Sequence, residues 1–344
     1  MLYMFAAAIL AALMVLVLMP GCIKKLRSLK FGQTMYELGP QSHLHKKGTP
    51  NMGGLVTAGV TVVCSILFAL LMHAHTPMDG GGFWSPQNAL WGLLFVCLGS
   101  MAVGFADDFI KDVKKNHEGL KPKQKIAGQL IVGILFSLWA YKYVGSEVII
   151  PFTHRTWDLG IFYLPLITLT VLFMTNSANL QDGLDGLLGT VTTVGMAGYG
   201  VIALLFALAA GTGAMNNCYV AGILAFALAG AKLGYLRYNR YPAQIFMGDT
   251  GSMFVGGAMV GVAVVLRIEF LLLFISFTCV MSSVSVIMQR YYYKATHGKR
   301  IFKMSPIHHH FELCGMKETQ IVRMYGIVTF VLSAVAVLSV MKWF

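Results

Sequence analysis

The sequence predicts an all-α polytopic integral membrane protein with about ten transmembrane helices. Of the 344 residues, 57% are hydrophobic and only 12% are charged, and the mean hydropathy is +0.69. This composition lies far from that of soluble domains. Apolar windows of the ~17–25 residues that a helix needs to cross a bilayer recur along the whole chain. The polar stretches between them are short, so residues 1–344 are expected to form a single transmembrane domain.

Ten spans are expected. Their approximate limits are 2–19, 53–72, 89–105, 126–143, 161–175, 187–208, 218–235, 252–266, 269–290 and 322–342. The first segment lacks a basic start and a small-residue cleavage site, so it is expected to remain as a helix rather than act as a signal peptide.

Two irregular features are expected along this series of helices. The β-branched run Val148–Ile150, followed by Pro151 and by Trp157, predicts a small periplasmic hairpin at the membrane surface. The Met/Ser-rich stretch Met281–Met288 is expected to bend the ninth span. Six cysteines without a CxxC pair give no sign of a disulfide or zinc framework, and most are expected to be buried as small apolar residues.

The distribution of Lys and Arg predicts the orientation. Segments 20–50, 106–125, 232–251 and 290–323 hold six, six, three and seven of these residues, which is 22 of the 26 in the chain. Because basic loops remain on the cytoplasmic side, this face is expected to be cytoplasmic, and ten spans place both termini outside. The net charge of +12 then reflects this bias and contact with the lipid bilayer, and it does not indicate binding to nucleic acid.

Acidic residues are scarce, and their grouping is the strongest functional signal. Of the fourteen, five lie in three short polar stretches, at Asp107-Asp108, at Asp182 and Asp185, and at Asp249. Two adjacent carboxylates at a helix C-terminus face the negative end of the macrodipole and repel each other, so a metal ion or the lysines that follow must offset them. The pattern therefore suggests carboxylates and lysines that hold a divalent cation and phosphate groups.

Each polar loop also has an ordinary explanation when it is taken alone. One of Asp182 and Asp185 could cap a helix, as could Asp249 or Thr250, and residues 45–54 could be a basic turn at the membrane surface. Three adjacent histidines on a helix point in different directions, so they favour anion contact or proton handling over a metal site. Because all these loops are assigned to one face, a single composite site is the better explanation. Such a site suits phosphoryl transfer, in which two anions must be neutralised before they can meet.

These motifs resemble the polyprenyl-phosphate N-acetylhexosamine-1-phosphate transferase superfamily over essentially the whole chain. Asp107-Asp108, Asn179-Leu-Gln-Asp182-Gly-Leu-Asp185-Gly and Phe246-Met-Gly-Asp249 are typical of the superfamily. Two further segments are similar to its phospho-N-acetylmuramoyl-pentapeptide-transferase branch. They are Ser305-Pro-Ile-His308-His309-His310-Phe-Glu312 and Lys46-Lys47-Gly-Thr-Pro.

The resemblance implies a reaction and an architecture. Phospho-MurNAc-pentapeptide passes from UDP-MurNAc-pentapeptide to undecaprenyl phosphate, giving lipid I and UMP in peptidoglycan synthesis, with Mg²⁺ as cofactor. The implied protein is a homodimer in the bacterial cytoplasmic membrane. Its active-site cleft opens to the cytoplasm, and a hydrophobic groove beside the cleft admits the prenyl tail.

The resemblance also assigns residues. Asp249 matches the Mg²⁺ ligand, and Asp107 matches the carboxylate proposed as base on the lipid phosphate, with Asp108 beside it. Matches to phosphate-binding lysines are Lys111 and Lys125, with Lys123 as a third. Residues that match the polar lining of the cleft are Asn176, Asn179, Asp182, Asp185 and Asn239. Phe246 matches the aromatic residue that stacks on uracil, and Gly248 allows close approach of a ligand. Matches to nucleoside and sugar-phosphate contacts are Lys46, Gln289, His308 and His309, and His310 is assigned to the same substrate site.

Two positions depart from the family pattern, and three alternatives remain at this point. Asn51 stands where the family usually has Thr, as does Gln181, and both can still form hydrogen bonds. The nearest alternative is a superfamily branch that uses UDP-N-acetylglucosamine, which the His308–His310 segment disfavours. A transporter would place ionisable residues near the middle of its spans, whereas the charges here gather at the ends. A scaffold would not need acids that converge on one face.

Overall fold

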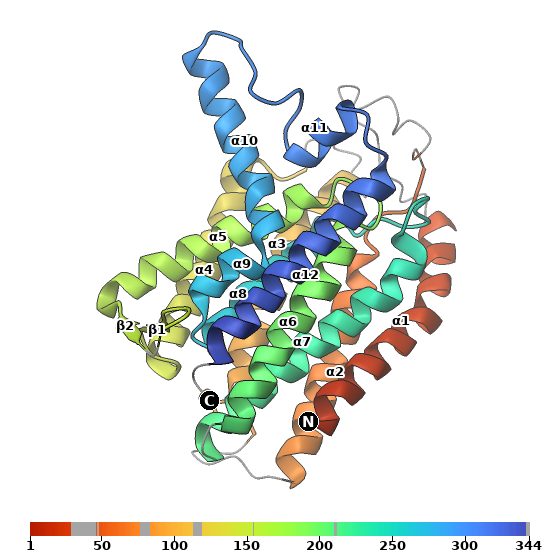
Figure 1. Ribbon diagram of the computed structural model, residues 1–344. Coiled ribbons are helices and arrows are strands. Elements are labelled where there is room, and N and C mark those ends of the chain that lie inside the picture. Colours follow the sequence, from red (N-terminus) through yellow and green to blue (C-terminus); the bar gives the residue numbers. More distant parts are fainter. Residues whose placement is uncertain are drawn as a thin grey trace.

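The computed structural model describes residues 1–28, 46, 48–75, 83–112, 119–153, 155–209 and 212–341, and it is a bundle of long helices (Figure 1). The helices are α1 (Leu2–Ser28), α2 (Gly54–His75), α3 (Ala89–Asp112), α4 (Pro122–Tyr143), α5 (Tyr163–Gln181), α6 (Leu187–Ala209), α7 (Thr212–Asn239), α8 (Gly248–Val265), α9 (Glu269–Ile275), α10 (Phe277–Ala295), α11 (Ile307–Leu313) and α12 (Glu318–Val340). Within the described residues, nine helices are long and apolar enough to cross a membrane, and the total is ten if the bent pair α9 and α10 is counted as one span. The expected all-α polytopic membrane fold is confirmed.

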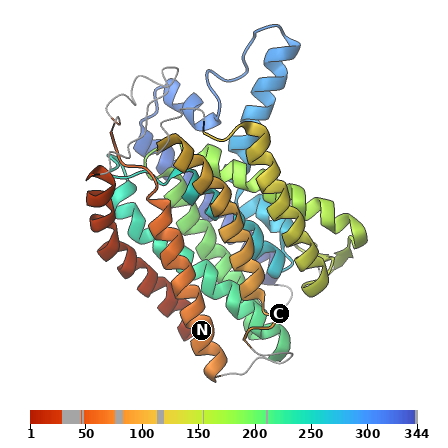
Figure 2. The same ribbon diagram turned by 180° about the vertical axis from the view of Figure 1, so that it is seen from behind.

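The two ends of the bundle differ. The start of α1 and the end of α12 lie toward the same end, whereas α11 and the tip of α10 lie at the opposite end, which we call the site end (Figures 1 and 2). A two-stranded antiparallel hairpin formed by β1 (Glu147–Ile149) and β2 (Thr156–Asp158) follows α4 at the end away from the site, as the β-branched run predicts. A short 3₁₀ turn, η2 (Gly160–Phe162), leads from it into α5.

Helix α8 is the buried centre of the bundle and packs on α3, α5 and α2. Glycines permit this packing. A Cβ atom at Gly104 of α3 would lie 2.2 Å from the carbonyl oxygen of Asp249, and one at Gly54 of α2 would lie 2.2 Å from the Cα atom of Gly251. Small residues let helix backbones approach closely inside a membrane, where apolar burial alone does not drive helix association. As a result, the last turns of α3 lie directly beside the first turn of α8.

The bend of the ninth span lies at Ser276, where α9 and α10 meet at 83°. The prediction that Met281–Met288 would bend the helix is wrong, because this stretch lies inside the continuous helix α10. Its serines are buried and already satisfied. Ser282 donates a hydrogen bond to the carbonyl of Thr278, and Ser283 bonds to Ser177 of α5 at 2.7 Å. Ser283 thus links α10 to α5, and neither serine interrupts the helix.

Candidate active site

Asp108 holds the N-terminus of α8. Its Oδ2 atom accepts hydrogen bonds from the Thr250 amide at 2.8 Å and from the Thr250 hydroxyl at 2.6 Å, and its Oδ1 atom accepts one from the Asp249 amide at 3.1 Å. A carboxylate is favoured at this position because the first amides of a helix lack partners and carry partial positive charge. The cap of α8 is therefore supplied by α3, and not by Asp249 or Thr250.

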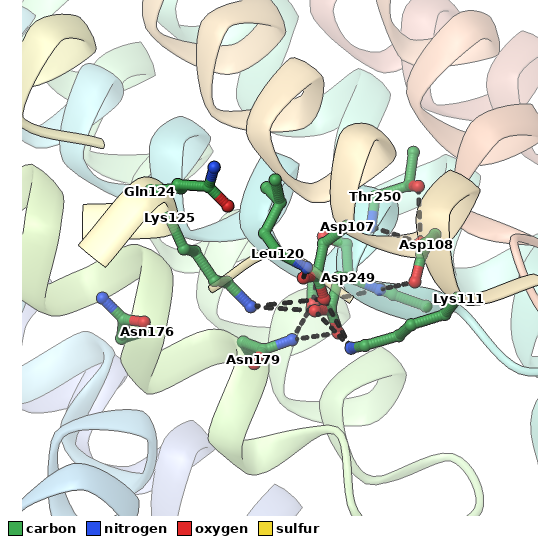
Figure 3. A network of polar contacts seen from close by, with 12 residues as sticks. Asp107, Asp108, Lys111, Leu120, Gln124, Lys125, Asn176, Asn179, Asp249 and Thr250 are labelled. Atoms are coloured by element: carbon green, nitrogen blue, oxygen red, sulfur yellow. Dashed lines mark hydrogen bonds and ion pairs between the residues drawn. The ribbon is translucent and has the colours of Figure 1, made fainter. Parts of the chain in front are cut away.

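Asp249 and Asp107 share two lysines (Figure 3). The Oδ2 atom of Asp249 lies 2.8 Å from Lys125 Nζ and 3.3 Å from Lys111 Nζ. Lys111 Nζ lies 2.5 Å from Asp107 Oδ2, and Lys125 Nζ lies 3.9 Å from the same atom. Asn179 of α5 donates a hydrogen bond to Asp249 Oδ1 at 2.7 Å. We call Asp107, Lys111, Lys125 and Asp249 the acid–lysine cluster.

Local sequence explains how the cluster forms. Lys111 follows Asp107 by one helical turn, so both side chains lie on the same face of α3. Pro122 begins α4 and fixes its first turn, which carries Lys125 toward α8. The Oδ1 atom of Asp107 accepts the amide of Leu120 at 2.8 Å, which ties the start of α4 to α3. Two carboxylates thus face two ammonium groups drawn from three helices.

The two carboxylates of this cluster match the number of carboxylate ligands that Mg²⁺ usually takes. Among the described residues, no three His, Cys, Asp or Glu side chains are grouped as a metal site. Mg²⁺, however, usually takes only one or two carboxylates and fills its other positions with water and phosphate oxygens. Asp107 and Asp249 reach the same ammonium group of Lys111, so their carboxylates converge on one point. A divalent cation could occupy such a point in place of an ammonium group.

A second set of buried charges fixes the turn 182–186 between α5 and α6. Lys46 Nζ lies 2.7 Å from Asp185 Oδ1 and 2.6 Å from Glu318 Oε1 at the start of α12. The same Glu318 atom accepts the Asp185 amide at 2.5 Å, and Asp185 Oδ2 accepts the Ala243 amide at 2.8 Å. We call Lys46, Asp185 and Glu318 the Lys46 network. It joins four distant parts of the chain.

Further contacts of this turn come from α7 and α11. Asn239 accepts the Gly186 amide at 3.1 Å and donates to the Ile245 carbonyl at 2.9 Å. His308 is fully buried, and its ring lies against Gly183, where an added Cβ atom would come within 2.4 Å of His308 Nε2. The His309 ring lies 4.4 Å from that of His308, and its Nδ1 atom lies 3.1 Å from Glu312 Oε2. The histidine segment thus covers the turn.

Comparison with known proteins identifies the family. The model of glycosyl transferase family 4 matches residues 90–267. Phospho-N-acetylmuramoyl-pentapeptide-transferases from Thermoanaerobacter sp. (strain X514) and Desulfitobacterium hafniense are 42% and 40% identical to the chain, covering 94% and 98% of it and 95% and 97% of their own lengths. The enzyme of that name from Clostridium perfringens is 39% identical over 97% of both chains. The chain belongs to the phospho-N-acetylmuramoyl-pentapeptide-transferase family.

Residues predicted by the family resemblance fall into groups that the structure separates. Asp107, Asp249, Lys111 and Lys125 form the acid–lysine cluster, and Asn179 binds it through Asp249. Asn51 lies at its edge, with Nδ2 3.5 Å from Asp108 Oδ1. Gly248 has φ of +76° and its Cβ would meet Asp108 Oδ2 at 2.6 Å, so this position requires glycine.

Other predicted family residues bind backbone or neighbouring side chains. Asn176 donates to Gln129 of α4 at 3.0 Å and lies to one side of the cluster (Figure 3). Gln289 binds the backbone of Phe302, and His310 Nδ1 accepts the Lys303 amide at 3.1 Å. Phe246 is half-buried, and its backbone pairs with Pro50 and Gly53. Lys123 is exposed in the first turn of α4. Their roles toward substrate stay predictions.

Asp182 lies beside a charge within a membrane span. Burial raises the pKa of the Asp182 carboxyl to about 7, an effect that the nearby Lys232 partly offsets. Lys232 is fully buried in α7 and donates to Thr57 Oγ1 at 3.0 Å. The expectation that charges occur only at span ends therefore has an exception in Lys232, which lies seven residues before the end of α7 at Asn239.

Sequence reasoning missed Glu318 and Lys232 as parts of the site. An acid in the first turn of a helix is common because it complements the macrodipole, so Glu318 carries no distinctive signal. Lys232 was counted only among the basic residues of its face, although a lysine within an apolar run is unusual and could have been singled out.

Proposed function

We propose that this protein transfers phospho-MurNAc-pentapeptide from UDP-MurNAc-pentapeptide to undecaprenyl phosphate, forming lipid I and UMP. The observation that carries the proposal is the meeting of Asp107, Asp249, Lys111 and Lys125 at the site end, in a chain of this family. Two anionic substrates can approach one another only where positive charge neutralises both. Lys111 and Lys125 would provide that charge once a divalent cation takes their place on the two carboxylates.

Asp249, together with Asp107, is the proposed Mg²⁺ site. When bound, the ion would neutralise the phosphate oxygens of the donor. Lys111 and Lys125 would move from carboxylate to phosphate oxygens. Both side chains reach solvent, since Lys111 is 35% exposed and Lys125 is 17% exposed. The exposed Lys123 would be a third contact at the edge.

Direct displacement is the proposed route. An oxygen of the lipid phosphate attacks the phosphorus next to the sugar, a new P–O bond forms, and the bond to UMP breaks with its electron pair leaving on UMP. The attacking oxygen is already an anion, so it needs no base to remove a proton during the attack. Asp107 would accept any proton that the lipid phosphate still carries, and it would position Lys111, which orients the phosphate. Asp108, which caps α8, is proposed to fix Asp249 through the backbone.

The turn 182–186 is the proposed nucleotide site. Lys46, Asp185, Asn239 and Phe246 would contact the nucleoside, with Phe246 stacked on uracil. Residues of the surrounding polar lining and the sugar-phosphate contacts would be Asn51, Asn176, Asn179, Asp182, Gly248, Gln289, His308, His309 and His310. Support comes from the backbone amides and buried charges that hold this turn in one conformation.

We further propose a setting for this enzyme. The site end would face the cytoplasm of a bacterium, with both termini outside, because most Lys and Arg residues lie in segments of the site end. The protein would act as a single transmembrane domain in the inner membrane, as a homodimer.

The test follows UMP release by purified protein with undecaprenyl phosphate, Mg²⁺ and one of two donors. UMP is expected with UDP-MurNAc-pentapeptide, none with UDP-N-acetylglucosamine, and none after EDTA. UMP release from the N-acetylglucosamine donor alone would support the proposed phosphoryl transfer but contradict the proposed donor substrate. If folded protein releases no UMP with either donor, the proposal is wrong.

A further inference from the structure

A polar pocket lies away from the acid–lysine cluster, between the outer half of α10 and the segment that leads back to α11. Its volume is about 700 Å³. Four cations line it, namely Arg290 and Lys294 of α10 and Arg300 and Lys303 of the returning segment. None of the described residues lining it is acidic. We call it the basic pocket.

The pocket has a fixed wall. Gln289 accepts the amides of Ile301 and Phe302 at 3.0 Å and donates to the carbonyl of Phe302 at 3.0 Å. The Lys303 amide is bound by His310 Nδ1 at 3.1 Å. These bonds hold the returning segment on α10 and on α11, so the two pairs of cations face a common space.

The convergence of these charges needs an explanation beyond orientation. The bias of basic residues toward one face accounts for cations in this region, and the macrodipole favours Lys294 near the end of α10. Neither effect brings four cations to one pocket without an acid. Lys303 Nζ already donates to the carbonyl of Leu313 at 2.9 Å, whereas Arg290 and Lys294 form no ion pair within the described residues. An anionic ligand would remove the repulsion.

We propose that the basic pocket binds the carboxylates of the peptide part of the donor. This inference rests on the proposed function. The nucleotide, phosphates and sugar would occupy the turn 182–186 and the acid–lysine cluster, which leaves the peptide as the remaining anionic part of the donor. The pocket connects to that turn through α11, because Lys303 binds His310 and the neighbouring His308 lies on Gly183.

The size and chemistry of the pocket fit this ligand. Five extended residues span roughly 17 Å at the usual rise per residue, and the pocket adjoins the histidine segment, because Lys303 lines the pocket and its amide binds His310. A peptide ends in a carboxylate, and guanidinium groups bind carboxylates through paired hydrogen bonds. Arg290 supplies such a group from α10 and Arg300 supplies one from the returning segment.

Binding of donors by isothermal titration calorimetry, with the lipid acceptor left out, tests the proposal. The test variant is Arg290→Gln with Lys294→Gln, and the control is Lys299→Gln, an exposed cation that does not line the pocket. The Kd for UDP-MurNAc-pentapeptide is expected to rise at least tenfold in the test variant and less than twofold in the control. The Kd for UDP-MurNAc, which has no peptide, is expected to be equal in all three proteins.

Three outcomes would overturn the inference. One is an unchanged Kd for the pentapeptide donor in the test variant, and another is an equal rise for both donors. The third is a difference that occurs only in nanodiscs containing phosphatidylglycerol and is absent in phospholipid-free detergent, which would assign the pocket to lipid headgroups. Wild-type UMP release from the pentapeptide donor, measured on the same preparation, separates failure of this inference from failure of the proposed function.

Discussion

The acid–lysine cluster and the Lys46 network both pair lysines with carboxylates at the site end. They differ in the hydrogen-bond donors that their carboxylates accept and in the exposure of their side chains. In the acid–lysine cluster, the Asp249 carboxylate accepts hydrogen bonds only from side chains among the described residues, Asp107 also accepts the Leu120 amide, and Lys111 is 35% exposed. In the Lys46 network, each side chain is at most 10% exposed, and both acids also accept backbone amides.

This difference indicates that the acid–lysine cluster serves the reaction, whereas the Lys46 network supports the shape of the site. Side-chain partners that are partly exposed can exchange carboxylate for phosphate at small cost. Buried charges tied to backbone cannot move without leaving a polar group unpaired. We therefore expect the acid–lysine cluster to govern turnover and the Lys46 network to govern the shape and affinity of the nucleotide site.

The largest effect is expected from Asp249→Ala. It removes the carboxylate on which both lysines and Asn179 converge, and turnover should fall at least about a hundredfold, as for loss of a central charge-stabilising group. Circular dichroism and thermal unfolding should show intact protein, since Asp108 still caps α8. Retention of more than a few per cent of wild-type activity in folded protein would remove Asp249 from the proposed role.

Lys125→Gln should sharpen the assignment of the cluster. Turnover should fall roughly ten- to a hundredfold through loss of a charge that contacts phosphate. The variant leaves Asp107 and Asp249 with one lysine, so added Mg²⁺ should raise its melting temperature more than that of wild type. Lys299→Gln, an exposed change of equal charge, is the control. Identical Mg²⁺ responses in the two variants would argue against a cation site at the cluster.

Glu318→Gln should act on affinity rather than on chemistry. It keeps the shape of the side chain but removes a buried charge from Lys46, so the donor Kd should rise roughly tenfold and the melting temperature should fall. The matched control is Glu147→Gln, whose partner Arg267 is exposed at the opposite end, and its effect on stability should be at most about 1 kcal/mol. Equal melting temperatures for the two variants would contradict a supporting role for Glu318.

A separate effect, on stability and not on turnover, is expected in the pH dependence of unfolding. The raised pKa of Asp182, about 7 in the folded protein, means that the folded state binds more protons than the unfolded state between about pH 4 and pH 7. This contribution to stability is present below pH 4 and is lost as pH rises to 7. Asp182→Asn should remove that part of the fall, so its melting temperature should exceed that of wild type by more at pH 8 than at pH 4. A constant difference would show that Asp182 does not titrate in this window.

Sequence reasoning reached the fold and the main site because both leave periodic or clustered signals. Apolar spans are long, and the acids recur at the ends of spans on one predicted face. The features that sequence reasoning did not predict depend on the direction in which each side chain points. Asp107 and Asp108 are adjacent, yet one meets the lysines and the other caps α8, because successive residues on a helix point about 100° apart. The break at Ser276 likewise was not predicted, since the composition pointed to Met281–Met288 instead.

Turnover at saturating donor, acceptor and Mg²⁺ tests the central distinction most directly, with Asp249→Ala and Glu318→Gln compared in the same UMP-release assay. The division between chemistry and support predicts that Asp249→Ala stays at least about a hundredfold below wild type. It predicts that Glu318→Gln recovers to within about threefold of wild type once donor is saturating, because its defect lies in affinity. Equal losses of kcat in the two variants, or a larger loss in Glu318→Gln, would contradict it.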